Sequence, residues 1–262
     1  MRYAALGAGK RLRPLLVLAA ARAVGGLDIA ALRAACAVEV VHAYSLVHDD
    51  LPCMDNDRLR RGQPTAHVRY GEARALLAGD ALQAFAFEIL TPADDTVPLP
   101  LQARLCSLLA RAAGTFGMAG GQAIDLASVN CRLTEPELRT MHRLKTGALL
   151  KGSVRMGAAT AIHALSAEAR DALDNYGDAI GLAYQVVDDI LDVTANTGQL
   201  GKTAGKDAAT DKPTYVSLLG LDGARALVER LYQDAMQALD LTAPLRVDWL
   251  RALAGRVVHR ER

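Results

Sequence analysis

The spacing of apolar residues is the feature that most constrains the fold of this chain. Apolar side chains recur at helical intervals almost everywhere, and no stretch longer than a few residues alternates with the period of a strand. Alanine and leucine, both good helix formers, dominate the composition. The sequence therefore predicts an all-α fold, which we expect to form one domain over residues 1–262.

Clusters of turn-forming residues mark the expected ends of the helices. They lie at 25–28, 91–100, 130–137, 163–168, 196–207 and 242–245. Each is too short to be a flexible linker between domains. The clearest helix start is Thr134, which matches a capping box with Glu137 and is followed by a proline. We expect this helix to run through Lys145 and Thr146 toward Ala161.

The charge balance and the cysteines exclude several classes of protein. The chain has 30 Lys and Arg against 29 Asp and Glu, and only 4% aromatic residues, which argues against a nucleic-acid binder. Its four cysteines form no C-x-x-C pair, so we expect neither a zinc site nor a redox motif. The apolar run Leu15–Ala21 is too short to cross a bilayer and only reaches the lower limit for a secretory leader. We expect a cytoplasmic protein without membrane insertion.

One group of carboxylates lies within an apolar helical stretch, "VVDDILD" (186–192). Asp188 and Asp192 are one helical turn apart on the same face, with Asp189 beside them. Like charges at this spacing repel, and their neighbours are apolar residues instead of Lys or Arg. This pattern favours an external cation.

A second group, "HDDLPCMDNDRLRRG" (48–62), follows another helical stretch at 31–50. Pro52 should end the helix, which leaves Asp49 and Asp50 at its C-terminus. Carboxylates there are unfavourable without a positive counter-ion. Two such groups make solvated acidic corners the weaker interpretation.

The ligand types indicate a hard cation. All-carboxylate sets without His or Cys suit Mg²⁺ or Mn²⁺, and Mg²⁺ often shares its carboxylates with phosphate oxygens. An EF-hand Ca²⁺ site does not match the pattern "DNDRLRRG". Basic residues near both groups fit a polyanion such as diphosphate: Lys10, Arg11, Arg13, Arg60, Arg61, Lys145, Lys202, Lys206 and Lys212.

These motifs together resemble the trans-isoprenyl diphosphate synthases, most of all the bacterial farnesyl diphosphate synthases. The matching segments run in family order from residue 9 to about 220: "GKRLRP", the first acidic group, "GEARALLAGDAL", "GGQAIDL", "HRLKTGALL", "GLAYQVVDDILDV" and "LGKTAGKD…DKPTY". The resemblance implies an orthogonal helical bundle of the isoprenoid synthase type, with a central cavity between two aspartate-rich helices.

The resemblance also implies roles for individual residues. The two aspartate motifs would hold Mg²⁺, three ions per active site, with Mn²⁺ as an alternative: Asp49, Asp50, Asp55, Asp188, Asp189 and Asp192. The diphosphate of the allylic substrate would be contacted by Arg60, Lys145, Lys202 and Lys212. The diphosphate of isopentenyl diphosphate would be bound by Gly9, Lys10, Arg13, His42 and Arg61. Thr146 and Gln185 would face the developing cation.

The implied reaction joins isopentenyl diphosphate to dimethylallyl and then geranyl diphosphate, giving farnesyl diphosphate. The residues expected to be catalytic are Asp49, Asp50, Asp55, Lys145, Thr146, Gln185, Asp188 and Lys202. His42 and Asp49 are seven residues apart and so share a helix face. Tyr44, about 7.5 Å below Asp49 along the helix, would limit chain length, with the small Ser45 beside it.

Several alternatives stay open from the sequence. Geranylgeranyl diphosphate synthase is the nearest, and a non-catalytic partner subunit of a heteromeric synthase is the second. A terpene cyclase would not need the second diphosphate site, and a metal-binding protein without catalysis would leave the K-T-G segment unexplained. We expect a homodimer, as is usual in the family. Family members usually carry another helix before "GKRLRP", so we expect a helix to be missing or truncated at the N-terminus.

Overall fold

The computed structural model describes residues 1–128, 133–194, 214–243 and 245–260. Its elements are α1 (Arg2–Ala5), α2 (Leu12–Ala23), α3 (Asp28–Asp49), β1 (Leu59–Arg60), β2 (Gln63–Pro64), α4 (Ala66–Tyr70), α5 (Glu72–Leu90), α6 (Leu99–Ala113), α7 (Met118–Ala127), α8 (Glu135–His142), the π-helical turn η1 (Arg143–Gly147), α9 (Ala148–Ala159), α10 (Ala167–Thr194), α13 (Tyr215–Asp240) and α14 (Asp248–Val258). The prediction of an all-α fold is confirmed, since the strands in the described ranges are two of two residues each.

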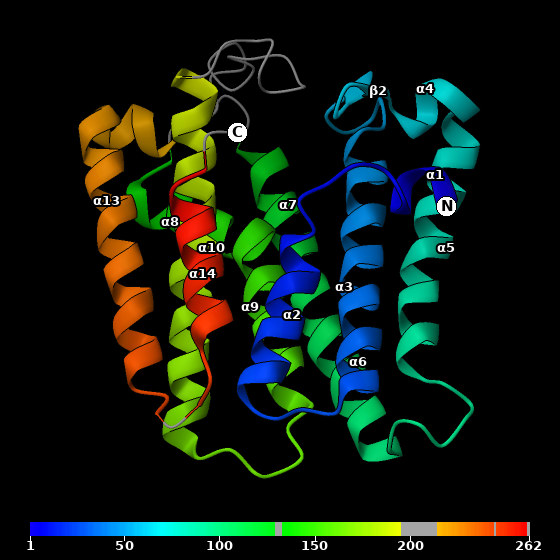
Figure 1. Ribbon diagram of the computed structural model, residues 1–262. Coiled ribbons are helices and arrows are strands. Elements are labelled where there is room, and N and C mark those ends of the chain that lie inside the picture. The colour runs from blue at the N-terminus through cyan, green and yellow to red at the C-terminus, as the bar shows by residue number, and fades with distance from the viewer. Residues whose placement is uncertain (129–132, 195–213, 244, 261–262) are drawn as a thin grey trace.

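The long helices lie side by side along one common direction (Figure 1). α3 packs on α5 at one side of the bundle and α10 on α13 at the other, while α2 and α9 lie between them. Because α3 and α10 run in the same direction from one end of the bundle, their C-terminal ends, which carry the two aspartate groups, come to the same end (Figure 1).

Two clusters of buried apolar side chains hold these helices together. One joins α10, α13 and α14 to α2, and the other joins α3, α5 and α6 to α2 and α9. Alanine and glycine are frequent at the contacts, which lets the backbones approach closely. A Cβ on Gly157 of α9 would overlap the backbone of α2 at Val17. The small residues therefore set the central spacing of the bundle.

Most of the predicted helix boundaries agree with the structure. The capping box of Thr134 and Glu137 is present, and the helix continues to Ala159 through η1, the π-helical turn that contains Lys145 and Thr146. The first acidic group does follow a helix that ends at Asp49. The break at 196–207 lies outside the described residues. The sequence did not indicate the break between α6 and α7, where Gly117 approaches the backbone of Ala112 too closely for a side chain.

The helix α3 is long and apolar enough to cross a membrane by length and composition, alone among the helices that the structure describes. In the bundle it packs against α2, α5 and α9. Its residues Val38 and Val41 are fully buried by these neighbours. The apolar character of α3 thus serves the core.

Candidate active site

A two-stranded hairpin returns the chain to the end of α3 just after the first aspartates. Its turn residues Arg61 and Gly62 both have positive φ, 53° and 74°, as a tight two-residue hairpin turn requires. The neighbouring Arg60 on β1 then donates from Nε to Asp50 Oδ1 at 3.0 Å and from Nη2 to the same oxygen at 2.5 Å. The hairpin therefore supplies the counter-ion that the C-terminus of α3 needs.

Asp50 and Asp49 differ sharply in their partners. Asp50 is buried, and burial raises the pKa of its carboxyl although the bonded Arg60 opposes the shift. Asp49 forms no side-chain hydrogen bond or ion pair with any described residue, and burial raises the pKa of its carboxyl to about 6, against the opposing charge of Lys145. The carboxylate of Asp49 thus remains available to bind a cation.

The second aspartate group lies near the end of α10 and is held by a chain of hydrogen bonds. Asp189, which is 2% exposed, accepts from Gln185 Nε2 at 3.0 Å and from the backbone N–H of Tyr215 at 2.8 Å. Gln185 Oε1 in turn accepts from Thr146 Oγ1 at 3.2 Å. Asp189 therefore fixes the first residue of α13 against α10 and η1.

A residue from the far end of the chain reaches the same group. Arg260 donates to Asp188 Oδ1 and to the carbonyl of Tyr184, both at 2.6 Å, and its guanidinium lies 4.0 Å from the centre of the Tyr184 ring. The Arg260 side chain is only 6% exposed. Asp188 thus has its positive partner from a position 72 residues away.

The segment K-T-G forms the π-helical turn η1, a rare geometry that is frequent at functional sites. Two glycines let this turn enter the bundle: a Cβ on Gly121 would overlap the backbone of Lys145, and Gly181 of α10 lies against Gly147. Lys145 Nζ donates to Asp125 Oδ2 at 2.6 Å and is directed by this bond. The carboxylate of Asp125 thereby positions the lysine beside Asp49.

Basic side chains crowd the wall between α2, α3 and the hairpin. Gly9 lies against the guanidinium of Arg61, and a Cβ there would overlap it. The Nε of Arg13 is buried and has no hydrogen-bond partner among the described residues, and burial lowers the pKa of Arg13. Burial, and then the positive charges of Arg13, Arg61, Arg60 and Arg11, lower the pKa of His42 well below its usual value. His42 is therefore neutral, and the wall attracts anions.

These residues surround one cavity of about 1150 Å³ at the end of the bundle. The sequence-predicted residues that line it are Gly9, Lys10, Arg13, His42, Tyr44, Ser45, Asp49, Arg60, Arg61, Lys145, Thr146 and Asp188. They come from four separate regions of the chain. The cavity has Asp49 and Asp188 among its lining residues, together with the basic wall, so it can take molecules that carry more than one phosphate.

Other predicted residues lie behind the lining. Asp50, Gln185 and Asp189 are engaged in the bonds described above, and Asp55 and Asp192 are not among the lining residues. Lys202 and Lys212 fall outside the described residues. In the described ranges no three His, Cys, Asp or Glu side chains converge tightly enough to hold a metal ion unaided. The six-aspartate metal site therefore stays a prediction.

Sequence reasoning missed several residues of this site. Gln122, Tyr184 and Glu39 also line the cavity, and Asp125 and Arg260 orient residues that do. Asp125 belongs to "GGQAIDL", a segment that the resemblance contains without a role for the residue. No sequence pattern links Arg260 to Asp188, because they are joined only by the packing of α14 on α10.

Comparison with known proteins gives consistent matches over the full chain. Farnesyl diphosphate synthase of Haemophilus influenzae is 45% identical over 261 residues, which cover 100% of this chain and 88% of the relative. The chloroplastic geranylgeranyl pyrophosphate synthase of Catharanthus roseus is 46% identical over 262 residues, or 100% of this chain and 73% of the relative.

A solved structure has the same fold. The geranyltransferase of Helicobacter pylori, complexed with magnesium and isoprenyl diphosphate, superposes with a TM-score of 0.86 and is 35% identical, covering 98% of this chain and 85% of that one. The family model described as polyprenyl synthetase matches residues 1–243, which include both aspartate groups, the basic wall and the π-helical turn. The chain, whose cavity is lined by Asp49, Asp188 and the basic wall, belongs to the polyprenyl synthetase family.

Proposed function

We propose that this protein is a trans-prenyltransferase that condenses isopentenyl diphosphate with dimethylallyl and then geranyl diphosphate, giving farnesyl diphosphate and diphosphate. The observation that carries the proposal is that one cavity is lined by Asp49, Asp188 and Lys145 and also by the basic wall around His42. Two separate places for anions match a reaction between two diphosphate substrates.

The aspartates fit magnesium. Carboxylate oxygens are the ligands that Mg²⁺ prefers, and the half-buried carboxylate of Asp49, with its raised pKa, has no hydrogen-bonded cation in the described part of the chain. Family membership and the magnesium-containing relative support the use of Mg²⁺. When bound, it supplies electrostatic stabilisation to a departing diphosphate. We assign three ions, with Mn²⁺ as a substitute, to Asp49, Asp50, Asp55, Asp188, Asp189 and Asp192.

The basic residues divide between the two substrates. Arg60 and Lys145 are oriented by carboxylates and are directed to the allylic diphosphate, together with Lys202 and Lys212. Gly9, Lys10, Arg13, His42 and Arg61 are assigned to isopentenyl diphosphate. Because His42 is neutral, it contributes one hydrogen bond, while the arginines contribute the charge. The unpaired Nε of Arg13 is a donor ready for a phosphate oxygen.

The chemistry requires no nucleophile from the protein. An allylic cation forms as diphosphate departs, the double bond of isopentenyl diphosphate attacks it, and the released diphosphate takes the proton. The Thr146 hydroxyl, held by Gln185, offers an oxygen that would face the cation. Apolar residues beside the aspartates, such as Val186 and Val187, are buried and help keep water away from the reacting carbons.

The length of the product depends on the part of the cavity below Asp49. Tyr44 lines it and contacts the ring of His48 edge to face at 5.7 Å, and Ser45 is held by the carbonyl of His42. A tyrosine here shortens the space for the growing chain, so we assign a fifteen-carbon product. The similarity to a geranylgeranyl pyrophosphate synthase makes a twenty-carbon product the second candidate.

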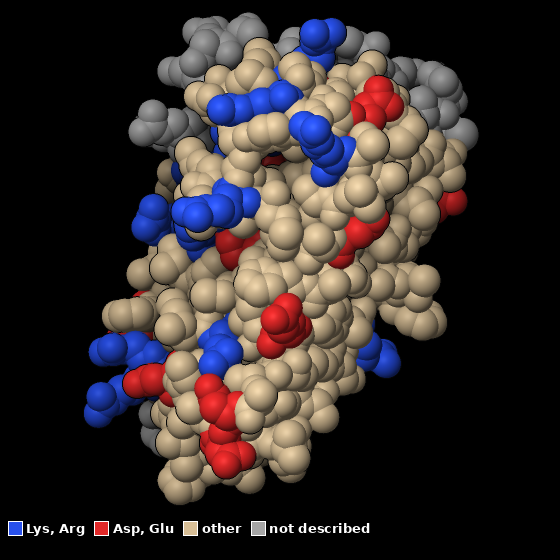
Figure 2. All heavy atoms as spheres, turned by 90° about the vertical axis from the view of Figure 1, so that its right-hand side faces the viewer, with Lys and Arg blue, Asp and Glu red and all other residues tan. Residues whose placement is uncertain are grey.

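We also propose that the active protein is a cytoplasmic homodimer. Figure 2 shows a largely uncharged surface on the face formed by α4 and α5, interrupted by separate acidic side chains, with Lys and Arg more frequent toward the top. Exposed apolar side chains on these helices include Val68, Leu76, Leu77 and Phe85. A second copy of the chain would cover this area. Sedimentation of the purified protein tests this directly, and a monomer at micromolar concentration would contradict it.

The decisive experiment is an incubation with dimethylallyl diphosphate and labelled isopentenyl diphosphate, with and without Mg²⁺, followed by chain-length analysis. We expect a fifteen-carbon product that needs Mg²⁺ and that lengthens in Tyr44→Ala. Tyr232→Ala, on α13 outside the cavity, is the matched control and should leave the product unchanged. A twenty-carbon product would favour the second candidate, and a folded protein without condensation would favour a partner subunit.

A further inference from the structure

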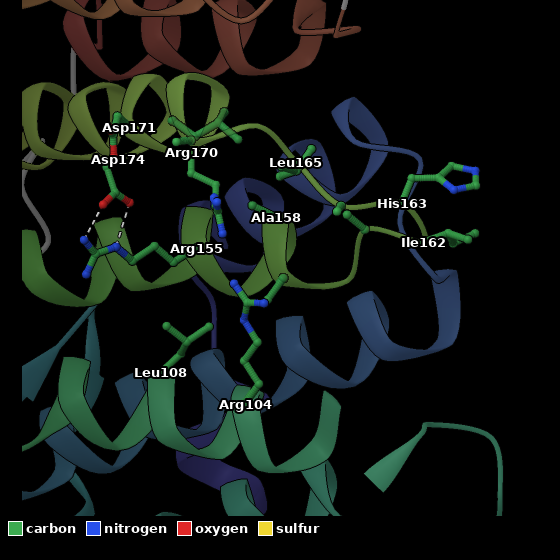
Figure 3. A pocket seen from close by; sticks show the side chains of 15 residues that line it. Arg104, Leu108, Arg155, Ala158, Ile162, His163, Leu165, Arg170, Asp171 and Asp174 are labelled. Carbon is green, nitrogen blue, oxygen red and sulfur yellow. Dashed lines mark hydrogen bonds and ion pairs between the residues drawn. The ribbon is translucent and has the colours of Figure 1, made fainter. Parts of the chain in front are cut away.

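A second cavity, of about 540 Å³, lies at the opposite end of the bundle between α6, α9 and the start of α10 (Figure 3). None of its lining residues lines the active-site cavity. Asp171 on its wall and Asp188 of the active site are 17 residues apart on α10 (188 − 171), which is about 25 Å along a helix axis. The cavity is thus separate from the site described above.

Three arginines from three helices point into this cavity: Arg104 from α6, Arg155 from α9 and Arg170 from α10 (Figure 3). Arg155 is paired, since its Nε donates to Asp174 Oδ1 at 2.6 Å and its Nη2 to Oδ2. The side chains of Arg104 and Arg170 form no hydrogen bond or ion pair with any residue that the structure describes. Two guanidinium groups therefore share a cavity without an anion between them.

The charges and walls of the cavity define what it can hold. Among the lining residues Asp174 offsets Arg155 and Asp171 offsets one further charge, which leaves one positive charge; Glu168, outside the lining, interacts with Arg170 at the surface. Apart from the exposed His163, the rest of the wall is apolar and includes Leu108, Leu165, Leu173 and Ile162, the last of which is 66% exposed. Alanines from α9 and the following loop keep the space open. The cavity combines a cationic part with an apolar part.

We propose that this cavity binds an organic phosphate with an apolar body. The phosphate would lie between Arg104 and Arg170, whose planar groups approach from different helices and together match several oxygens of one tetrahedral anion. The apolar body would lie against Leu108 and Leu165. The volume falls within the range of cavities that hold small organic ligands, about 300 to 1,000 Å³. This assignment does not depend on the proposed function.

The test is a calorimetric titration of the full chain with n-octyl phosphate in EDTA, alongside inorganic phosphate and octanol. We expect octyl phosphate to bind more tightly than either fragment. The double variant Arg104→Ala with Arg170→Ala should weaken its binding by about tenfold or more, because two charge-assisted contacts are lost. Arg111→Ala removes an exposed arginine of α6 that lines neither cavity and should leave the affinity unchanged.

Two further variants keep the result interpretable. Arg61→Ala weakens any phosphate binding in the active site and should not change the titration assigned to the second cavity. The double variant with lysines in place of Arg104 and Arg170 keeps the charge and should recover part of the affinity. Equal affinity in the wild type and the folded alanine double variant would overturn the proposal. The same titration with isopentenyl diphosphate shows whether the ligand class includes the protein's own substrates or only other organic phosphates.

Discussion

Asp49 at the end of α3 and Asp189 in α10 are both carboxylates on helices rich in apolar residues, but their partners differ. Asp49 has no hydrogen-bonded partner in the described ranges and an elevated pKa, whereas Asp189 accepts bonds from Gln185 and from the backbone of Tyr215. The first therefore stays available for a cation, and the second holds α13 in place. Asp189 thus has a structural role in addition to the metal site that we assign to it.

The largest effect is expected for a substitution of Asp49, the carboxylate that we assign to cation binding. Asp49→Asn keeps the shape and removes the charge at the cavity wall, so we expect activity to fall about 100- to 1,000-fold, as for the loss of one electrostatic contact to a transition state. Asp28→Asn, at the other end of α3 and outside the lining residues, is the matched control, because Asp57 of the same acidic group accepts from Arg60. A steady-state assay at saturating Mg²⁺ measures both. Equal losses in the two variants would remove the distinction between them.

The pH dependence of folding stability tests the packing of His142 beside α10 and α13. It is buried and stacked on Tyr215 at 5.8 Å, and burial lowers its pKa to about 4 from 6.5. The unfolded chain therefore takes up the proton first as the pH falls, and stability is lost between about pH 6.5 and about pH 4. The loss amounts to about 3 kcal/mol by linkage.

Urea unfolding at several pH values measures this slope. His142→Phe retains a ring against Tyr215 and should remove the part of the slope that belongs to His142. His163→Phe alters an exposed histidine and is the control, because it should leave the slope unchanged. An unaltered slope in His142→Phe would mean that the pKa of His142 does not change on folding.

A smaller effect is expected at Asp189. Asp189→Ala leaves the backbone N–H of Tyr215 and the amide of Gln185 without an acceptor, so we expect a loss of about 2 kcal/mol in the free energy of unfolding. Asp49→Ala should cost no stability, because the carboxylate it removes has no bonded partner among the described residues. Thermal or urea unfolding without metal compares the two. A greater loss for Asp49→Ala would reverse our comparison.

The smallest effect concerns the basic wall. Gly9→Ala places a methyl group against the Arg61 guanidinium and should displace it, which we expect to raise the KM for isopentenyl diphosphate about tenfold, the equivalent of one contact. The KM for the allylic substrate should change little. Gly255→Ala, where nothing lies within 4 Å of the new Cβ, is the control for a glycine substitution. A change in both KM values would mean that the wall serves both substrates.

The sequence by itself determined the helical class, the positions of both aspartate groups and about half of the residues that line the active-site cavity. These features are local, because periodicity, caps and turn formers act over a few residues. The hairpin that pairs Arg60 with Asp50 joins positions only ten residues apart, but from the sequence we expected Arg60 to contact a diphosphate and did not predict this pairing.

Only the tertiary structure decided which carboxylates face the cavity and which are buried in the bundle. The bonds of Asp189 with Tyr215 and of Asp188 with Arg260 span 26 and 72 residues and depend on how α13 and α14 pack on α10. The cavity with Arg104 and Arg170 likewise exists only where three helices meet. Helical periodicity fixes the face on which a residue lies, but the partner of that face depends on packing between distant segments.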